Sequence, residues 1–207
     1  MVDVIRTRRS VSQPRMDKDR APDHEIARAA LESARWAPNH KRTEPWRFYL
    51  LDDARIERLA RLNAEMLARR GSKQDKVDNK LREWQVQRGV VIITCASAPE
   101  ADEVTRAEDR LAVGCAAQNF MLHLWSEGVA SKWSTAAVWE HEDFWPLLGK
   151  DDDSGTGSGT GSGTGSGTGS GTEEVIGLFF YGHATEAPPA KRNKELKDVL
   201  VDFRAAH

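Results

Sequence analysis

The chain has 207 residues, 39% of them hydrophobic and 30% charged, which is enough for one domain with a sizeable core. Its 30 Lys and Arg residues against 32 Asp and Glu residues give a net charge of −2, and this argues against a protein that binds nucleic acid mainly by neutralising phosphates. No stretch approaches the roughly 20 apolar residues of a membrane helix, and the first residues are charged. Cys95 and Cys115 lack metal-ligand spacing. We therefore expect a cytoplasmic protein with no membrane, nucleic-acid or metal partner.

The N-terminal half predicts two helices with a strand between them. The first helix is expected from the capping residue Asp23 to about residue 36, with a narrow face of small residues toward the core. A strand is expected over 46–51, where aromatic residues are enriched. A second helix should cover about 54–70 and stop at Gly71. The predicted small-residue face of the first helix consists of Ile26, Ala29, Ala30, Ser33 and Ala37.

The rest of the chain predicts two more strands and a long helix. The apolar run 90–95 and the segment 175–181 are both rich in β-branched or aromatic residues, which is typical of strands. Between them a helix is expected over about 106–127, ending at Gly128. Its apolar residues suggest burial on more than one side, as in a central helix: Leu111, Cys115, Phe120, Leu122 and Trp125. These elements favour the α/β or the α+β class.

Ser-Gly-Thr-Gly repeats fill residues 154–172, a composition that has nothing to bury and is typical of a flexible coil. The repeats could separate two domains, but only 35 residues follow them, too few for an independent core. We therefore predict a single domain over residues 1–207, with residues 154–172 as an insertion in one of its surface loops.

Two N-terminal segments could carry function. Arg8, Arg9 and Ser10 place two guanidinium groups and a hydroxyl side by side, which suits a phosphate, although a basic surface cluster is the commoner cause of such a run. The segment 37–46, which contains His40, ends a helix in a loop of polar side chains and then enters a strand. Such loops often carry chemistry. The alternative is a capped turn without function.

Two later segments could contribute to the same site. Residues 128–135 follow the long helix and place Trp133 beside two hydroxyl groups, so that the indole could flank a planar ligand or simply fill a core. Residues 182–184 end the last strand, and Lys191 and Arg192 follow a pair of prolines. This segment could bring a cation back to the anion held by the N-terminus, or it could be a connector with solvated charges.

Taken in order, these four segments resemble the FMN-dependent nitroreductase family. The resemblance covers most of the chain: Arg-x-Ser at 8–10, Ala-Pro and a polar loop leading to Pro-Trp at 37–46, the segment 128–135, and a late strand that ends at Gly182 before a basic segment. The loop Asn-His-Lys at 39–41 is similar to the Ala-Pro-Asp-His-Lys loop of the compact branch of that family, the NAD(P)H nitroreductases.

The resemblance implies an α+β fold, a nitroreductase-like three-layer sandwich whose central, mostly antiparallel sheet is flanked by helices. It also implies an intertwined homodimer with FMN sites at the interface. The implied activity is that of an NAD(P)H-dependent oxidoreductase, which passes electrons through bound FMN to a nitroaromatic, quinone or similar planar acceptor by a ping-pong mechanism. In that mechanism the flavin carries the chemistry, so no protein nucleophile or metal is needed.

The residues that the resemblance places around FMN are Arg8, Arg9, Ser10, Trp36, His40, Trp133, Ser134, Thr135 and Arg192. The first three would hold the phosphate and the ribityl chain, Trp36 and His40 would contact flavin or ribityl, and the 133–135 segment would be contributed from the dimer. Arg192, with Lys191 as the alternative, would complete the phosphate site. Donors or cations near the pyrimidine side of the ring would stabilise the negative charge of the reduced flavin.

Two departures from the family pattern keep other functions open. Glu44 stands where the family usually has Gln before Pro-Trp, and Trp36 replaces a smaller or basic residue. Both favour a second hypothesis, a flavin carrier or sensor of the same fold without turnover. A third hypothesis is a plain anion-binding or interaction domain whose resemblance to the family is accidental.

Overall fold

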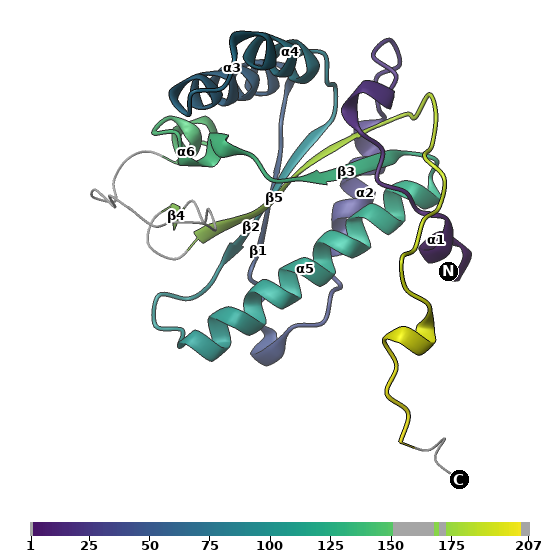
Figure 1. The fold of residues 1–207 in the computed structure, drawn as a ribbon. Coiled ribbons are helices and arrows are strands. Elements are labelled where there is room, and N and C mark those ends of the chain that lie inside the picture. The colour runs from purple at the N-terminus through teal and green to yellow at the C-terminus, as the bar shows by residue number, and fades with distance from the viewer. Residues whose placement is uncertain (1, 151–167, 170–172, 204–207) are drawn as a thin grey trace.

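A central antiparallel sheet organises the molecule (Figure 1). The computed structural model describes residues 2–150, 168–169 and 173–203. The sheet runs in the order β1-β2-β5-β3, and each neighbouring pair is antiparallel. The bounds of these strands are Trp46–Leu50 for β1, Val90–Ala96 for β2, Ala130–Ser134 for β3 and Glu173–Gly182 for β5.

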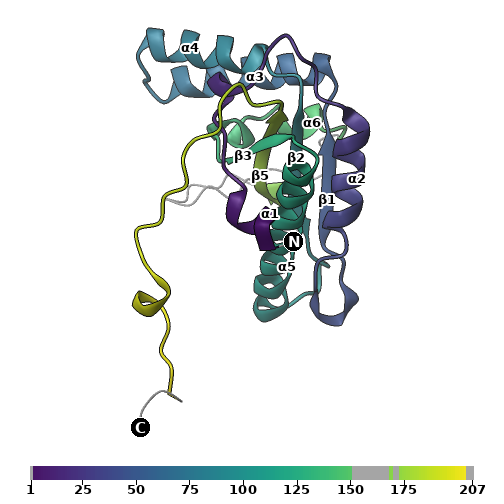
Figure 2. The same cartoon turned by 90° about the vertical axis from the view of Figure 1, so that its right-hand side faces the viewer.

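Side chains of the central strands alternate between two cores, one on each face of the sheet. In β2, Val90 and Ile92 belong to one core, whereas Val91 and Ile93 belong to the other. An apolar run such as Val90–Ile93 is expected for a strand that is covered on both faces. Figure 2 shows helices on the two sides of the sheet. The predicted α+β class and the three-layer arrangement are therefore confirmed.

Helices α2 (His24–Ala34) and α5 (Glu103–Ser126) cover one face. As predicted, the carboxylate of Asp23 caps α2 by accepting a hydrogen bond from the N–H of Glu25. The predicted face of α2 is wrong by one position in its centre, because Ala27, Ala30 and Ala34 are buried while Ala29 is exposed. Several alanines surround this helix, and the small-residue pattern fits more than one face.

Helix α5 is buried along one side within the chain that the structure describes. Ala116 and Phe120 are fully buried, but Leu111 is 72% exposed and Cys115 is exposed. The prediction of burial on more than one side is therefore wrong for the isolated chain. This leaves an apolar strip on a helix that otherwise lies across the middle of the molecule (Figure 1).

Helices α3 (Asp53–Arg69), α4 (Gln74–Gln85) and α6 (Phe144–Leu147) cover the opposite face together with the short helix η3 (Ala137–Glu140). Helix α3 matches its prediction, and Gly71 follows it in the left-handed region with φ of 72°. Helix α4 is not predicted from the sequence, because only Val77 and Trp84 of its 12 residues are buried.

The two terminal segments run alongside each other near β3 before the C-terminal one leaves the body. Ser10 pairs with Ser131 of β3, and Met16 pairs with Ala184 just after β5. The last described residues then extend away from the body as an arm (Figures 1 and 2). The short helices of the terminal segments and of the 39–44 loop are α1 (Val2–Thr7), η1 (Gln13–Arg15), η2 (His40–Arg42) and η4 (Leu196–Asp198).

The predicted insertion at 154–172 lies outside the described residues except for Thr168–Gly169, which form β4 and pair with β5. On its two sides, Lys150 and Glu173 are joined by an ion pair. Strand β5 follows the insertion and lies between β2 and β3, so the chain before and after the repeats shares one sheet. Among the described helices, none is long and apolar enough to cross a membrane.

Candidate functional site

A cluster of arginines lies where the N-terminal segment joins the sheet. The N–H of Val11 donates to the carbonyl of Ser131 over 3.1 Å, and Arg8 Nη1 lies 3.4 Å from Ser10 Oγ. Burial, and then the nearby guanidinium groups of Arg192 and Arg9, lower the pKa of Arg8. The C-terminal arm therefore brings a cation back to the N-terminal pair.

This cluster of Arg8, Arg9 and Arg192 has no acidic partner among the described residues. Within the described part of the chain none of the three forms an ion pair with a carboxylate, whereas all four arginines of α3 do. The guanidinium of Arg9 instead donates to the main-chain carbonyls of Arg6 and Arg8, over 2.8 and 2.9 Å. Three unneutralised guanidinium groups beside the hydroxyl of Ser10 are suited to an anion such as phosphate.

Trp133 forms an aromatic surface on the neighbouring edge strand. Its ring is 38% exposed and lies 5.0 Å from the ring of Phe179, centroid to centroid, and its Nε1 donates to the carbonyl of Ile176 over 3.1 Å. The indole can lie there because Gly177, directly below it, has no side chain. Ser134 and Thr135 follow at the end of β3, half-buried and exposed respectively.

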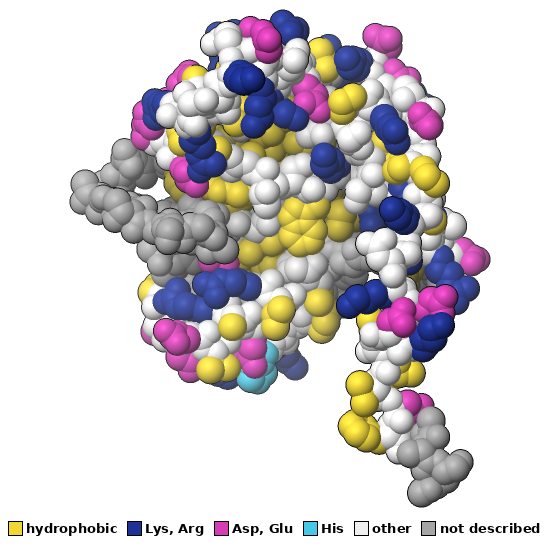
Figure 3. All heavy atoms as spheres, in the orientation of Figure 1, with side chains coloured by type: hydrophobic (Ala, Val, Ile, Leu, Met, Phe, Trp, Pro, Cys, Tyr) yellow, Lys and Arg dark blue, Asp and Glu magenta, His cyan; other side chains and the backbone are white. Residues whose placement is uncertain are grey.

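The arginine cluster and Trp133 share one region of the surface. Ser131 pairs with Ser10, and Trp133 lies two residues farther along β3, on the same side of the strand. Figure 3 shows hydrophobic side chains gathered at the centre of this face, with Lys and Arg side chains around them. The described residues thus place a flat apolar surface beside a cluster of guanidinium groups.

His40 lies near the start of α5, whereas Trp36 follows the end of α2, where Ser33 Oγ lies 2.7 Å from Nδ1 of His123 near the other end of α5. Trp36 is 77% exposed, and its Nε1 donates to Glu32 Oε1 over 3.2 Å. His40 Nδ1 lies 2.7 Å from Glu108 Oε2, near the start of α5. The N-terminal segment instead contacts the last turn of α5, where Trp125 Nε1 donates to Thr7 Oγ1.

His40 is therefore far from the N-terminal part of the predicted site within one chain. Glu108 and Trp125 are 17 residues apart on α5, which corresponds to about 25 Å along the helix. The structure brings Arg8, Ser10, Trp133 and Arg192 to one region and leaves His40 outside it, while the exposed Trp36 contacts Glu32 and Arg35 beside it. Glu44 is exposed at the end of the His40 loop, and its N–H donates to Asn39 Oδ1 over 3.1 Å.

Asp109 is a residue of this region that the sequence analysis missed. Its side chain is 3% exposed, and Oδ1 accepts a 2.6 Å hydrogen bond from Thr43 Oγ1 in the His40 loop. Oδ2 is buried and has no partner in the described residues. An acidic residue three positions before Ala112 and four before Val113, on the same face of the helix, was the available signal, because an unpaired charge is rare on the buried side of a helix.

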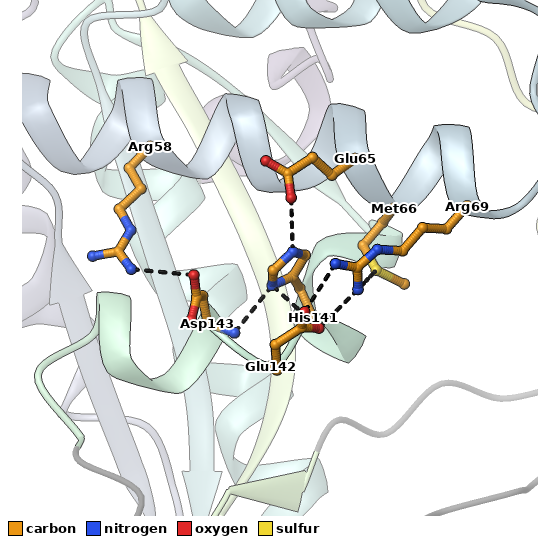
Figure 4. Close-up of polar contacts among 7 residues, drawn as sticks. All are labelled: Arg58, Glu65, Met66, Arg69, His141, Glu142 and Asp143. Carbon is orange, nitrogen blue, oxygen red and sulfur yellow. Dashed lines mark hydrogen bonds and ion pairs between the residues drawn. The ribbon is translucent and has the colours of Figure 1, made fainter.

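A second polar cluster anchors the segment that follows Thr135 (Figure 4). His141 is 4% exposed, its Nε2 lies 3.1 Å from Glu65 Oε2 of α3, and its Nδ1 accepts from the N–H of Asp143. Neighbouring ion pairs are Arg69–Glu142 and Arg58–Asp143 to α3, and Arg70–Glu140 to the C-cap that follows it. These four consecutive residues tie the chain after β3 to α3, and the sequence analysis missed them because each partner is distant in sequence.

Comparisons with known proteins agree with the motifs and the fold. The model of the Nitroreductase family matches residues 5–151. The Bacillus subtilis protein named "Putative NAD(P)H nitroreductase YfhC" is 24% identical over 204 residues, which cover 97% of this chain and 93% of that protein.

Solved structures share the fold. The nitroreductase-like family protein from Bacillus cereus superimposes with a TM-score of 0.71 at 22% identity, covering 98% of this chain and 95% of that one. The NADPH:FMN oxidoreductase from Vibrio harveyi, in complex with NAD+, superimposes with a TM-score of 0.68 at 12% identity, covering 100% of this chain and 78% of that one.

Proposed function

The chain belongs to the nitroreductase family, as its ordered motifs predict, and on that premise we propose that it is an FMN-dependent oxidoreductase that uses NAD(P)H as its reductant. The observation that carries the proposal is the arginine cluster of Arg8, Arg9 and Arg192, which has no carboxylate partner in the described residues and lies beside the exposed ring of Trp133. A phosphate and a planar ring system are the two chemically distinct parts of FMN, and this surface offers a group for each.

The residues present fit FMN by their chemistry. Arg8, Arg192 and the hydroxyl of Ser10 would hold the phosphate, because guanidinium groups bind phosphate oxygens strongly and the cluster contains no acid to compete. Trp133 would lie against the ring system, and Ser134 and Thr135 would supply hydroxyl groups. Arg9 donates to main-chain carbonyls in this structure, so its contribution would be mainly its charge.

A homodimer would complete the site. His40 contacts Glu108, which lies about 25 Å along α5 from Trp125, the residue that the N-terminal segment contacts, so a second copy would be needed to bring His40 to the same cofactor. The exposed apolar strip of α5 supports such an interface. The arm also carries apolar residues that nothing in the described chain covers: Leu196, Val199, Leu200, Val201 and Phe203 are between 49% and 89% exposed.

Bound FMN would supply the redox chemistry, taking a hydride from NAD(P)H and passing the electrons to a nitroaromatic, quinone or similar planar acceptor in a ping-pong cycle. The protein's own part is to bind, orient and tune. The arginines fix one end of the cofactor, and Trp133, held through its Nε1, supports the other end. Reductant and acceptor would use the same face in turn, which requires a slot for one planar molecule at a time.

The test is an absorbance spectrum of the purified protein before and after NAD(P)H is added without oxygen. We expect flavin bands that NAD(P)H bleaches and that a nitroaromatic or quinone restores. A protein that stays colourless after incubation with FMN would overturn the proposal. A protein that binds FMN but does not oxidise NAD(P)H would support the second candidate, a flavin carrier or sensor. The exposed carboxylate of Glu44 favours this candidate, because negative charge near the ring opposes flavin reduction.

A further inference from the structure

We propose that Asp109 is a positioning residue, which fixes the loop 39–44 through Thr43 and so sets the place from which His40 reaches the cofactor. The inference rests on the proposed function, since His40 has a cofactor to reach only there. Asp109 itself would not touch FMN. It acts on the main-chain conformation of the loop.

The loop has a main-chain conformation that needs an external hold. Lys41, Arg42 and Glu44 have φ of 54°, 55° and 44°, in the left-handed region that residues with a Cβ seldom adopt. Strained residues of this kind persist only where the surroundings determine them, and they gather at ligand-binding sites. Three of them within four positions therefore call for a specific restraint.

Asp109 provides that restraint from inside α5. Its buried Oδ1 accepts the hydroxyl of Thr43 over 2.6 Å, and the N–H of Thr43 donates to the carbonyl of His40 over 3.2 Å. Thr43 lies between the strained residues Arg42 and Glu44, so this bond holds the loop at its centre. The preceding residue of α5, Glu108, contacts His40 itself.

A purely structural role does not explain the choice of an aspartate here. Asp109 is buried with Oδ2 unpartnered, and burying a carboxylate that has a single hydrogen-bond donor opposes folding. An apolar residue would pack on this side of α5 at lower cost, as Ala112 and Val113 do. The cost is consistent with a residue kept for the geometry of the loop it holds.

The first experiment measures the loop without any cofactor. Thr43→Val keeps the shape of the side chain and removes the hydroxyl, whereas Thr43→Ser keeps the hydroxyl. Hydrogen exchange of the peptide that covers residues 38–46 should be at least tenfold faster in Thr43→Val and within about twofold of the parent in Thr43→Ser. Equal exchange in Thr43→Val and the parent would overturn the proposal, and so would equally fast exchange in both variants.

The second experiment measures FMN affinity by fluorescence quenching on the same proteins. Thr43→Val should bind FMN about tenfold more weakly, and Thr43→Ser should match the parent. Thr94→Val is the matched control, because it removes a hydroxyl from another buried carboxylate, Glu173, without touching the loop. If Thr94→Val weakens FMN binding as much as Thr43→Val, the effect is general destabilisation and the positioning role is wrong.

The two experiments separate this inference from the proposed function. If the parent does not bind FMN, the proposed function fails, while the exchange measurement still reports on the restraint. If Thr43→Val does not fold, Asp109→Asn and Asp109→Leu take its place. Asn keeps an acceptor oxygen for Thr43 and should retain slow exchange, whereas Leu should lose it, and equal exchange in the two variants would overturn the proposal.

Discussion

The indole of Trp133 occupies the space that a side chain on Gly177 would need. A Cβ added at Gly177 would lie 2.1 Å from Trp133 Nε1 and 2.6 Å from Trp133 Cδ1, far inside van der Waals contact. Because Gly177 lies on β5 and Trp133 on β3, the contact also fixes the indole on the neighbouring strand. The hydrogen bond from Nε1 to Ile176 depends on the same close approach.

Gly177→Ala should therefore move the indole and weaken FMN binding. The added methyl forces Trp133 away from the sheet and breaks its bond to Ile176, which should lower the free energy of unfolding by about 1–3 kcal/mol. Near-UV circular dichroism should show the change in the indole environment, and FMN titration should show the loss of affinity.

The control for this substitution is a double-mutant cycle with Trp133→Ala. Once the indole is removed, Gly177→Ala should cost less stability than in the parent, because the main clash is gone and only the contact with Phe179 remains. Equal costs in the two backgrounds would mean that Trp133 does not depend on Gly177.

Arg8→Ala should release FMN while the fold stays largely intact. Losing one charge-assisted contact to a phosphate should cost about 1.5–3 kcal/mol of binding free energy, roughly ten- to a hundredfold in affinity. Arg61→Ala on α3 is the matched control, since it removes an exposed guanidinium whose partner is the carboxylate of Glu57. If both variants bind FMN as tightly as the parent, Arg8 is only surface charge.

Elements with local signals were predictable from the sequence. Asp23 and Gly71 mark helix ends through caps that involve near neighbours, and the apolar run of β2 needs no partner to be recognised as a strand. Strand β3 was not predicted as a strand, because Ala130–Ser134 is short and mixes polar with apolar residues. Its strand character comes from pairing with β5 and with the N-terminal segment.

The sequence predicts residues for the candidate site, and their role in binding stays a prediction, whereas it gives no sign of the hydrogen bonds that hold them. The Arg8, Ser10 and Trp133 motifs stand in continuous sequence, so their resemblance to the family is visible without a structure. The bond between Thr43 and Asp109 joins residues 66 positions apart, and no local pattern pairs them. A single chain also does not bring His40 to the arginine cluster, and in the proposed dimer a second copy would do so.

Leu111→Glu should dissociate the proposed dimer and release FMN with it. A carboxylate placed on the exposed apolar strip of α5 would have to be buried without a partner in the interface. Sedimentation velocity across the micromolar range should show dimer for the parent and monomer for the variant, with flavin absorbance following the dimer. Gln85→Glu on exposed α4 makes the same charge change and should leave both unaffected. A parent monomer that keeps all its flavin would contradict the shared site.

The stability of the protein should fall in acid through Glu173. Burial favours its neutral form, but bonds donated by Lys150, Thr94 and Tyr49 outweigh burial and lower the pKa of Glu173. Since the folded pKa lies below the unfolded one, the stabilisation is present above about pH 4.3 and is lost as the pH falls through the folded pKa.

Urea unfolding between pH 6 and pH 3 measures this contribution. Glu173→Gln should flatten the loss of stability on acidification, whereas Glu186→Gln, at an exposed carboxylate that forms no ion pair in the described chain, should leave the pH profile unchanged. At neutral pH, Lys150→Met should cost about 1–3 kcal/mol, because it leaves the buried carboxylate without its cation. Parallel pH profiles for Glu173→Gln and the parent would show that another group governs the acid limb.

Replacing residues 154–172 with four or five residues should leave FMN content and turnover nearly unchanged. The contact between Lys150 and Glu173 holds the two ends of the insertion close together. Four new residues together with Asp151 to Asp153 make a link of seven residues between Lys150 and Glu173, and such a link spans up to about 23 Å. Shortening the loop should raise the free energy of unfolding by about 1 kcal/mol, since closing a loop costs about 0.6 kcal/mol per doubling of length. Loss of the pairing between β4 and β5 removes only two residue pairs. If every link length that preserves folding abolishes turnover, the repeats are a working part of the site, and their interpretation as a neutral insertion is wrong.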